Sequence, residues 1–354
     1  MHIGIYDPYL DDLGGGEKYM MTIAECLSHQ HDVDIFWDNA SDLIAVATRF
    51  SLDVSTIKIV PNVFAQTIPL WKRLLVTRKY DVIIFLSDGS IPLVLSKKLL
   101  VHIQQPLQSA DQSSIKRKRI TKIFYNSLFT RKYNQKLFTH IPSMVLYPPV
   151  VIKSVPVSKE NIILHVGRFR VNSEWEGDYK KQFVMVESFK KMIDTGVTGW
   201  KFVLAVSLRA EDAEQFARLR HNAKGYPIEF LIDVPNDALW KTYNKAKIYW
   251  HASGYGEDLS AHPDYAEHFG ISTVEAMGAG VVPIVINAGG QTEIVENGKD
   301  GLLWNTLEEL VSKTKKLMHD QKLWQQLSLN AREKAQKFTK EQFCRDVQKL
   351  VSES

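Results

Sequence analysis

Short apolar runs, rich in β-branched and aromatic residues, alternate with segments of helical periodicity in the first part of the chain. After the first run, Tyr19, Met20, Ile23 and Leu27 recur at helical spacing. Continuous apolar runs are typical of strands in a parallel sheet that helices cover on both faces. The pattern predicts a parallel α/β domain with strands at 2–7, 33–37, 81–86, 99–103, 121–126 and 143–149.

A second series of the same kind follows a proline-rich segment, YPPVVIKSVPVSKE (147–160), which is typical of a linker between domains. An amphipathic helix is predicted at 183–193, and the tail from Leu307 to Val351 has a helical pattern. Ligands of open parallel sheets bind beyond the carboxyl ends of the strands. The sequence therefore predicts two such domains in series, the second with strands at 161–167, 201–207, 228–234, 246–253 and 281–288.

Composition supports a globular chain of about two domains, since 354 residues are 45% hydrophobic and 24% charged. Cys26 and Cys344 are too few for a disulfide framework or a structural zinc site, which indicates a reducing compartment. The N-terminus does not have the pattern of a signal peptide, and charges interrupt the most apolar stretch, 82–103. We therefore expect neither a secreted nor an integral membrane protein.

The net charge of +4 is unevenly distributed along the chain. Residues 51–150 contain 15 Lys or Arg against 4 Asp or Glu, whereas residues 1–50 contain 2 against 9. This excess predicts a surface that meets phosphates or an acidic membrane, and the alternative is a set of solvated helix faces. The basic run 116–119 has few aromatic neighbours, so nucleic-acid binding is not expected.

In the segment 265–293, Glu267 and Glu275 lie on either side of a predicted helix start at Phe269–Gly270–Ile271. The first amides of a helix and its positive dipole end bind phosphate well. Carboxylates accept hydrogen bonds from sugar hydroxyls. The segment therefore fits a diphosphate flanked by two hydroxyl-bearing rings. The alternative is a capping Glu267 and a solvated Glu275.

Glycines follow the first strand of the first domain, and cations follow the first strand of the second domain. Arg168, and Lys180 or its neighbour Lys181, bracket the loop after the strand 161–167 and match the charge of a diphosphate leaving group. Ordinary surface cations are the alternative. The glycines 14–16 let a backbone approach a ligand closely, or form a flexible turn. The pattern G-x-G-x-x-G is absent, which disfavours a nicotinamide-dependent dehydrogenase.

Two histidines follow or end predicted strands. His102 and His251 are candidates for hydroxyl binding or proton transfer, and the alternative is burial in the core. The segment 251–268 contains several metal-ligating residue types, but it lacks the helical spacing of a zinc protease, so no metal is expected.

These motifs resemble those of family 4 retaining glycosyltransferases, the glycosyltransferase group 1 family with the GT-B fold. The segment EHFGISTVEAMGAGVVPIVINAGGQTEIVENGKDGLLW (267–304) is similar to the donor-binding segment of that family. VGRF followed by KKQFVMVESF is similar to its arginine–lysine pair, and GGGEKY to its first glycine loop. The segments YNSLFTRKY (125–133) and LYPPV (146–150) are similar to the end of its first domain.

The resemblance implies an α/β protein of the GT-B fold, with two Rossmann-like parallel-sheet domains that face a cleft. By that resemblance, residues 1–154 form an acceptor-binding domain, against which the helix 339–354 packs back. Residues 155–338 form the domain that binds a nucleotide-diphosphate sugar. The partners implied are this donor and a glycan or lipid-linked acceptor.

The resemblance also implies roles for single residues. Glu275 holds the ribose, Glu267 holds the donor sugar, and the amides of Phe269, Gly270 and Ile271 meet the sugar or the diphosphate. The implied diphosphate contacts are Arg168, Lys180, Gly15 and Gly16. Two departures are visible: the insert VNSEWEGDY leaves Lys180 or Lys181 open, and Gln104 stands where many members have histidine, two positions from His102.

The implied reaction is transfer of a hexosyl group to an acceptor hydroxyl with retention, without a metal or other cofactor. A diphosphate oxygen would help to take the acceptor proton, and Glu267, Arg168 and Lys180 would be the catalytic residues. We expect a cytoplasmic protein, peripheral at the inner face of an anionic membrane. The alternatives are a GT-B-like sugar-nucleotide epimerase and a non-catalytic sugar-nucleotide-binding protein.

Overall fold

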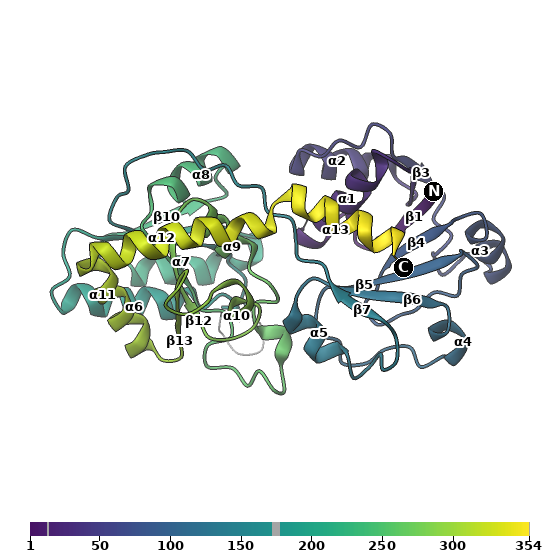
Figure 1. Ribbon diagram of the computed structural model, residues 1–354. Helices are drawn as coiled ribbons and strands as arrows, with labels where there is room; N and C mark the ends of the chain where they lie inside the picture. The colour runs from purple at the N-terminus through teal and green to yellow at the C-terminus, as the bar shows by residue number, and fades with distance from the viewer. Residues whose placement is uncertain (13, 172–177, 354) are drawn as a thin grey trace. The chain divides into compact units, whose positions relative to one another are not determined.

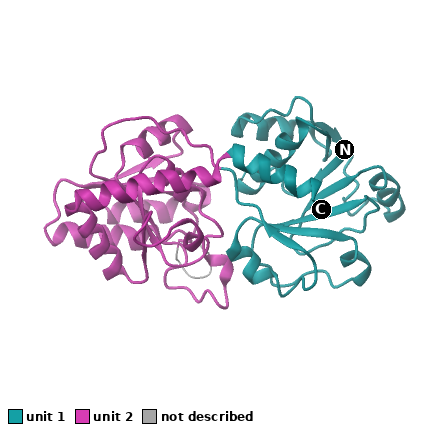
Figure 2. Ribbon diagram, in the orientation of Figure 1, with its two compact units in different colours: residues 1–149, 340–354 teal, residues 150–339 magenta. Residues whose placement is uncertain are grey.

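The computed structural model describes residues 1–12, 14–171 and 178–353 and divides the chain into two compact units (Figures 1 and 2). Unit 1 comprises Met1–Pro149 and Lys340–Ser354, and unit 2 comprises Val150–Thr339. The first boundary lies inside the proline-rich segment 147–160, a few residues before the predicted position at 154. The chain returns to unit 1 after residue 339.

Unit 1 is built on a seven-stranded sheet in the described residues, in the order β3-β2-β1-β4-β5-β6-β7, and every neighbouring pair is parallel. The predicted strands are present, and the last is shorter than predicted because prolines follow it. The short edge strand β3 was not predicted. The strands are β1 (His2–Tyr6), β2 (Asp32–Phe36), β3 (Lys58–Val60), β4 (Val82–Leu86), β5 (Lys98–Ile103), β6 (Ile120–Tyr125) and β7 (Ser143–Val145).

Helices cover both faces of this sheet. One core packs α1, α2 and α13 against it, and a second core on the other face includes the inner side of α3. The buried apolar runs of the strands therefore have partners on both sides, as the sequence predicts. The helices of unit 1 are α1 (Gly15–Ser28), α2 (Ala40–Phe50), α3 (Leu70–Thr77), α4 (Ser114–Arg117), α5 (Leu128–Asn134) and α13 (Lys340–Ser352).

The helix α13 is joined to α1 by packing and by a covalent bond. Phe343 and Val347 are buried in the same core as Leu27 of α1. A disulfide links Cys26 to Cys344, 318 positions apart in sequence. The inference of a reducing compartment from the cysteine count therefore loses its basis. The pairing arises from the return of α13 to the first sheet, which the spacing of the two cysteines could not show.

Unit 2 is built on a six-stranded parallel sheet in the described residues, in the order β10-β9-β8-β11-β12-β13. Its strands are β8 (Ile162–Arg168), β9 (Lys201–Ser207), β10 (Ile228–Ile232), β11 (Ile248–His251), β12 (Val282–Ile286) and β13 (Leu302–Trp304). Its helices are α6 (Gln182–Asp194), η1 (Ala210–Asp212), α7 (Ala213–Asn222), α8 (Asn236–Lys245), η2 (Pro263–Tyr265), α9 (Ile271–Gly278), α10 (Gln291–Ile294), α11 (Leu307–His319), α12 (Gln321–Ala335) and η3 (Gln336–Phe338).

Both sheets have the Rossmann-like form that the sequence predicts. In each, the strand order reverses once, between β1 and β4 in unit 1 and between β8 and β11 in unit 2. A crevice forms beyond the carboxyl ends of the strands at such a reversal, and ligands bind there. None of the helices in the described parts of the chain combines the length and apolar character needed to span a bilayer.

Candidate active site

The crevice of unit 2 brings together four side chains from different places in the sequence. Arg168 ends β8, His251 ends the neighbouring strand β11, and Glu267 lies in the connection from β11 to α9. Lys180 lies just before α6. These elements are consecutive around the reversal of strand order, which is why residues far apart in sequence meet there.

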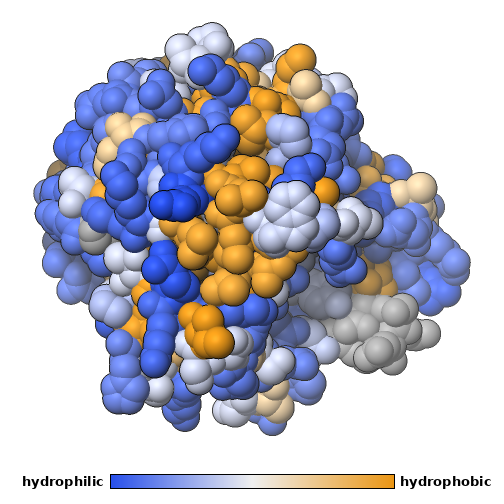
Figure 3. Space-filling view, turned by 90° about the vertical axis from the view of Figure 1, so that its right-hand side faces the viewer, coloured by the Kyte–Doolittle hydropathy of each residue, from blue (hydrophilic) through white to orange (hydrophobic). Residues whose placement is uncertain are grey.

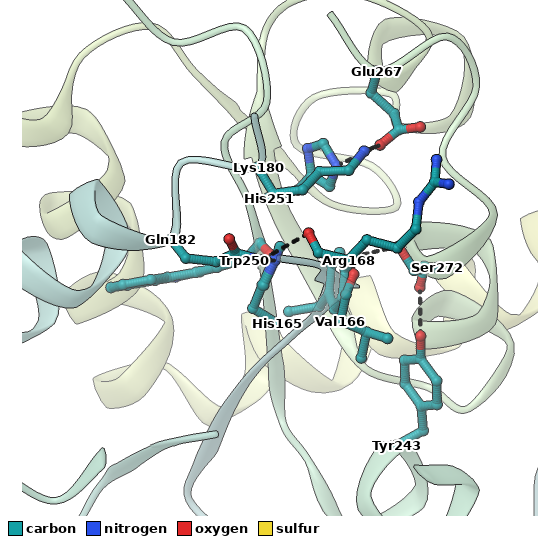
Figure 4. A network of polar contacts seen from close by, with 11 residues as sticks. His165, Val166, Arg168, Lys180, Gln182, Tyr243, Trp250, His251, Glu267 and Ser272 are labelled. Carbon is teal, nitrogen blue, oxygen red and sulfur yellow. Dashed lines mark hydrogen bonds and ion pairs between the residues drawn. The ribbon is translucent and has the colours of Figure 1, made fainter. Parts of the chain in front are cut away.

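Glu267 is the centre of this group (Figure 4). Lys180 Nζ donates to its Oε2 at 2.6 Å, and His251 Nε2 lies 2.9 Å from the same oxygen. Burial alone would raise the pKa of Glu267, but the charge of Lys180 and the hydrogen bond from His251 outweigh it and hold the pKa well below its usual range. Glu267 is therefore an ionised acceptor, and its Oε1 can receive a further donor.

Two buried histidines support this carboxylate. Burial lowers the pKa of His251, although its bond to Glu267 acts in the opposite direction, so a neutral ring donates through Nε2. Behind it, burial and the neighbouring His251 lower the pKa of His165 to about 3. His165 Nδ1 lies 3.0 Å from the carbonyl of Trp250, which fixes its ring. His251, which the sequence suggested as a possible site residue, lies directly beside Glu267. His165 was missed, since nothing in its strand distinguishes it.

The fall of the free energy of unfolding at acidic pH tests the burial of His165. Its folded pKa lies below the ordinary 6.5, so the unfolded chain binds more protons between about 3 and 6.5, and stability is lost as pH falls through this range. From about pH 6 to 4, the free energy of unfolding of His165→Gln should fall by about 1.4 kcal/mol less per pH unit than that of the wild type. Urea titrations measure this slope. His319→Gln, an exposed position in unit 2, should keep the wild-type slope, and a wild-type slope in His165→Gln contradicts the prediction.

The start of α9 lies next to Glu267. Gly270 has a φ of 120°, which disfavours any other residue, and a Cβ there would lie 2.6 Å from Gln291 Nε2. The amides of Thr273 and Val274 donate to the carbonyl of Gly270, so the amides of Ile271 and Ser272 point out of the helix end. Phe269 is buried and anchors this turn. The predicted helix start is confirmed, and its amides face the end at which an anion is stabilised.

Gly289 and Gly290 pack closely against the backbone of the Glu267 segment. Gly290 N donates to the carbonyl of Glu267 at 2.7 Å. A Cβ on Gly290 would lie 2.5 Å from Phe269 Cα, and one on Gly289 would lie 2.4 Å from the Glu267 carbonyl oxygen. The sequence analysis included the residues AGGQTE in the donor-binding segment. It did not predict that their glycines contact the backbone of Glu267 and Phe269.

Glu275 lies about one turn inside α9 and is partly buried. Tyr243 of α8 donates its hydroxyl to Glu275 Oε2 at 2.9 Å. Next to it, the hydroxyls of Tyr249 and Ser272 are 2.7 Å apart. Tyr243 was missed because an aromatic residue in an amphipathic helix is indistinguishable from an ordinary core residue. The tyrosine sets the orientation of the carboxylate.

A cavity of about 720 Å³ opens in front of Lys180 and Glu267. Arg168 is exposed at this cavity. Lys181 points elsewhere, because its Nζ is paired with Glu257 Oε1. The insert between Arg168 and Lys180 lies largely outside the described residues. The cavity is lined by Arg168, Arg170, Val171, Tyr179, Lys180, Arg209, Glu211, Asp212, Gln215, Ser253, Asp264, Tyr265, Ala266, Glu267 and His268.

The remaining candidates lie in unit 1. Gly15 begins α1, and a Cβ on Gly16 would lie 2.6 Å from the side-chain oxygen of Gln104. Their approach to a diphosphate stays a prediction. His102 is fully buried in β5, where its ring stacks with those of Tyr19 and Phe124 at 4.5 and 4.7 Å. Burial lowers the pKa of His102 to about 3. This is the environment of a core histidine.

An unpredicted carboxyl lies at the strand reversal of unit 1. Asp7 follows β1 and is almost fully buried, and its Oδ1 accepts from the amide of Tyr9 at 3.0 Å. Burial raises the pKa of Asp7 to about 7. Glu17 and Asp11 act in the same direction, since their negative charges disfavour its ionisation. The side chain is thus poised to exchange a proton near neutral pH. Its position directly after a strand, in YDPYL, is the signal that could have identified it.

The loop-rich region around 251–268 contains several side chains of metal-ligating types. In the parts of the chain that the structure describes, no group of three or more His, Cys, Asp or Glu side chains is arranged to hold a metal ion. Within 251–268, His251 and Glu267 bind one another instead.

The chain is similar to known proteins in both sequence and fold. Residues 151–334 match the family model described as glycosyl transferases group 1. A GDP-Man:Man(3)GlcNAc(2)-PP-Dol alpha-1,2-mannosyltransferase of Dictyostelium discoideum is 24% identical over 68% of this chain. The chain spans only 54% of that relative's own length.

Two solved structures share the whole fold. HepE of Anabaena, crystallised with UDP and glucose, has a TM-score of 0.71 at 17% identity, and both chains are covered fully. WaaG, a glycosyltransferase involved in lipopolysaccharide biosynthesis, has a TM-score of 0.62 at 14% identity, again over both full chains. The predicted GT-B fold class is confirmed. Since the family model covers more than half of its residues, this chain belongs to the glycosyl transferases of group 1.

Proposed function

We propose that this protein transfers a hexosyl group from a nucleotide-diphosphate sugar to a hydroxyl of a glycan or lipid-linked acceptor, with retention of the anomeric configuration. The single observation that carries the proposal is the group at the strand reversal of unit 2. There, Lys180 and His251 hold an ionised Glu267 beside the start of α9. A cation, an acceptor and outward amides suit the diphosphate and hydroxyls of such a donor.

Each residue has a task in the proposed reaction. Lys180 has three donors, of which one is used by Glu267, so others can meet the diphosphate. Arg168 adds a second cation at the cavity. The amides of Gly270, Ile271 and the buried Phe269 lie at the positive end of α9. We assign Glu267 Oε1 to a donor sugar hydroxyl and Glu275, oriented by Tyr243, to the ribose.

The proposed step breaks the bond between the anomeric carbon and the diphosphate oxygen. The acceptor oxygen forms its bond to that carbon on the same face, and its proton passes to the leaving diphosphate. Arg168 and Lys180 stabilise the negative charge that develops on the leaving group. Glu267 fixes the sugar in the reactive orientation. No metal or other cofactor takes part in this proposal.

We assign the acceptor to unit 1 and the donor to unit 2. Asp7 supports this, because a carboxyl that titrates near neutrality at a strand reversal suits the recognition of a hydroxyl. The mannosyltransferase of Dictyostelium has a lipid-linked oligosaccharide in its name, and HepE was crystallised with UDP and glucose. We therefore propose an acceptor that is a glycan or is carried on a lipid, and a protein that works at the surface of a membrane.

A panel of nucleotide sugars tests the proposal. Thermal unfolding of the full chain with GDP-mannose, UDP-glucose and related donors should show stabilisation by one of them, about 2.7 kcal/mol at a hundredfold excess over Kd. With an acceptor added, release of the nucleoside diphosphate should follow and should persist in EDTA. NMR of the product should show the donor's anomeric configuration. A changed sugar without acceptor indicates an epimerase, and binding without turnover indicates a binding protein.

Replacement of Glu275 tests the ribose assignment. Glu275→Gln keeps the volume but loses the charge that accepts from ribose hydroxyls, so we expect about tenfold weaker binding of the nucleoside diphosphate by calorimetry. Glu229→Gln, at an exposed carboxylate of the same unit, should leave the affinity unchanged. Unchanged affinity in Glu275→Gln would remove the ribose assignment.

A further inference from the structure

One side of unit 1 exposes a row of large apolar side chains on α3. Trp71 is 65% exposed, Leu75 is 59% exposed and Leu70 is 49% exposed. Trp71 and Leu75 are four residues apart and lie on one side of the helix. The opposite side is fixed inward, since Thr77 is buried and Arg73 Nε donates to the carbonyl of Val63 at 3.0 Å. The outward row therefore belongs to a well-anchored helix.

Two neighbouring segments extend this row. Leu95 is 45% exposed, and its amide donates to Thr77 Oγ1 at the end of α3. Arg119 binds the carbonyls on either side of Leu95, those of Val94 and Ser96, at 3.2 and 2.5 Å. These bonds fix the three segments to one another, and Ile115 of α4, close to Arg119, is 70% exposed. Figure 3, which faces this side of unit 1, shows a continuous apolar band between hydrophilic residues. We call the exposed side chains of Leu70, Trp71, Leu75, Leu95 and Ile115 the apolar strip.

The charged side chains of the segments that form the apolar strip are all positive, at 70–79, 94–98 and 114–119. Lys72, Arg78 and Lys79 of the α3 segment are exposed, as is Lys118 after α4. From residue 54 to 150 the acids are only Asp81, Asp88 and Asp111. Two of them are already neutralised, Asp81 by Lys97 at 2.7 Å and Asp111 by Lys116 at 2.5 Å. These two acids are therefore paired with other lysines and do not neutralise Lys72, Arg78, Lys79 or Lys118.

We propose that the apolar strip docks onto the surface of a bilayer that contains anionic lipids. Trp71 and the aliphatic side chains enter the boundary between head groups and acyl chains, where tryptophan is favoured. Lys72, Arg78, Lys79 and Lys118 meet the negatively charged head groups. A partner that is acidic and polar throughout would match the cations but would leave the five apolar side chains exposed to water. The bilayer satisfies both halves of the surface at once, and the inference does not depend on which sugar the protein transfers.

Vesicle sedimentation with the full chain tests this surface. The wild type should bind vesicles of phosphatidylcholine with about 30% phosphatidylglycerol, much less those of phosphatidylcholine alone, and more weakly in high salt. Lys72→Gln/Arg78→Gln should lower the partition coefficient about 25-fold, because each cation near the surface contributes about a factor of five. Trp71→Ser/Leu75→Ser should lower it at least about tenfold. Transfer to a water-soluble acceptor should be unchanged in both variants.

Matched controls separate the strip from general effects. Lys224→Gln/Lys241→Gln removes two exposed cations of unit 2, and Ile44→Ser removes a side chain of α2 that is 63% exposed. Both should bind vesicles as the wild type does. Equal vesicle binding by the strip variants and the wild type would overturn the proposal. So would a dimer that the wild type forms and Trp71→Ser/Leu75→Ser loses, since a second copy of the chain would then occupy the strip.

Discussion

Glu267→Gln should lower the rate of sugar transfer by about 10²–10³-fold while the protein stays folded. The substitution keeps the volume of the side chain but removes the charge that Lys180 and His251 hold in place. A donor sugar hydroxyl then loses an ionised acceptor, and hydrogen bonds to charged groups are the strong ones. Because the loss falls on the orientation of the reacting sugar, kcat should fall more than the affinity for the nucleoside diphosphate.

Glu257→Gln is the matched control for this experiment. Glu257 lies in the same connection between β11 and α9 and is paired with the neighbouring lysine, Lys181. If the proposed site is correct, Glu257→Gln keeps most of the activity, and calorimetry gives both variants near wild-type affinity for the nucleoside diphosphate. A Glu267→Gln enzyme with wild-type kcat would refute the assignment. An equal loss in both variants would show that the loop as a whole, and not Glu267, is what matters.

Reduction of the disulfide should destabilise unit 1 by about 2–5 kcal/mol. Cys26 and Cys344 close a loop of 318 positions, and a longer loop restricts the unfolded chain more. At this size of unit, the loss corresponds to a fall of roughly 5–15 °C in its unfolding midpoint. Scanning calorimetry with and without dithiothreitol measures the change, and the transition of unit 2, which contains no cysteine, is an internal reference.

Cys344→Ser distinguishes the bond from other effects of the reductant. The variant should unfold at the temperature of the reduced wild type, and dithiothreitol should not lower it further. The packing of Phe343 and Val347 keeps α13 in place in both cases. If the oxidised wild type, the reduced wild type and the variant all unfold at one temperature, the bond contributes nothing to stability.

Much of the fold could be predicted because its signals are local. Continuous apolar strands such as 82–86 and the helix at 182–194 follow from burial on both faces and from periodicity. The edge strand at 58–60 was missed, since three residues paired on one side carry too little pattern.

Some residues of the candidate site likewise have a local signal in the sequence, and others do not. Glu267 and the start of α9 stand out in sequence because a glutamate, a glycine and a helical pattern follow one another. Tyr243, Gly290 and the disulfide each depend on a contact between segments far apart in the chain. Such contacts leave no mark on the spacing of neighbouring residues, so only the three-dimensional structure shows them.

The return of α13 to the first sheet has a consequence for biosynthesis. Phe343, Val347, Leu350 and Val351 belong to the core that covers β1 and α1, but the ribosome adds them after all of unit 2. Unit 2 is continuous and can fold as soon as it emerges. Unit 1, although its strands are made first, must wait with the apolar side of α1 uncovered, so the nascent chain at this stage is the form that most needs a chaperone.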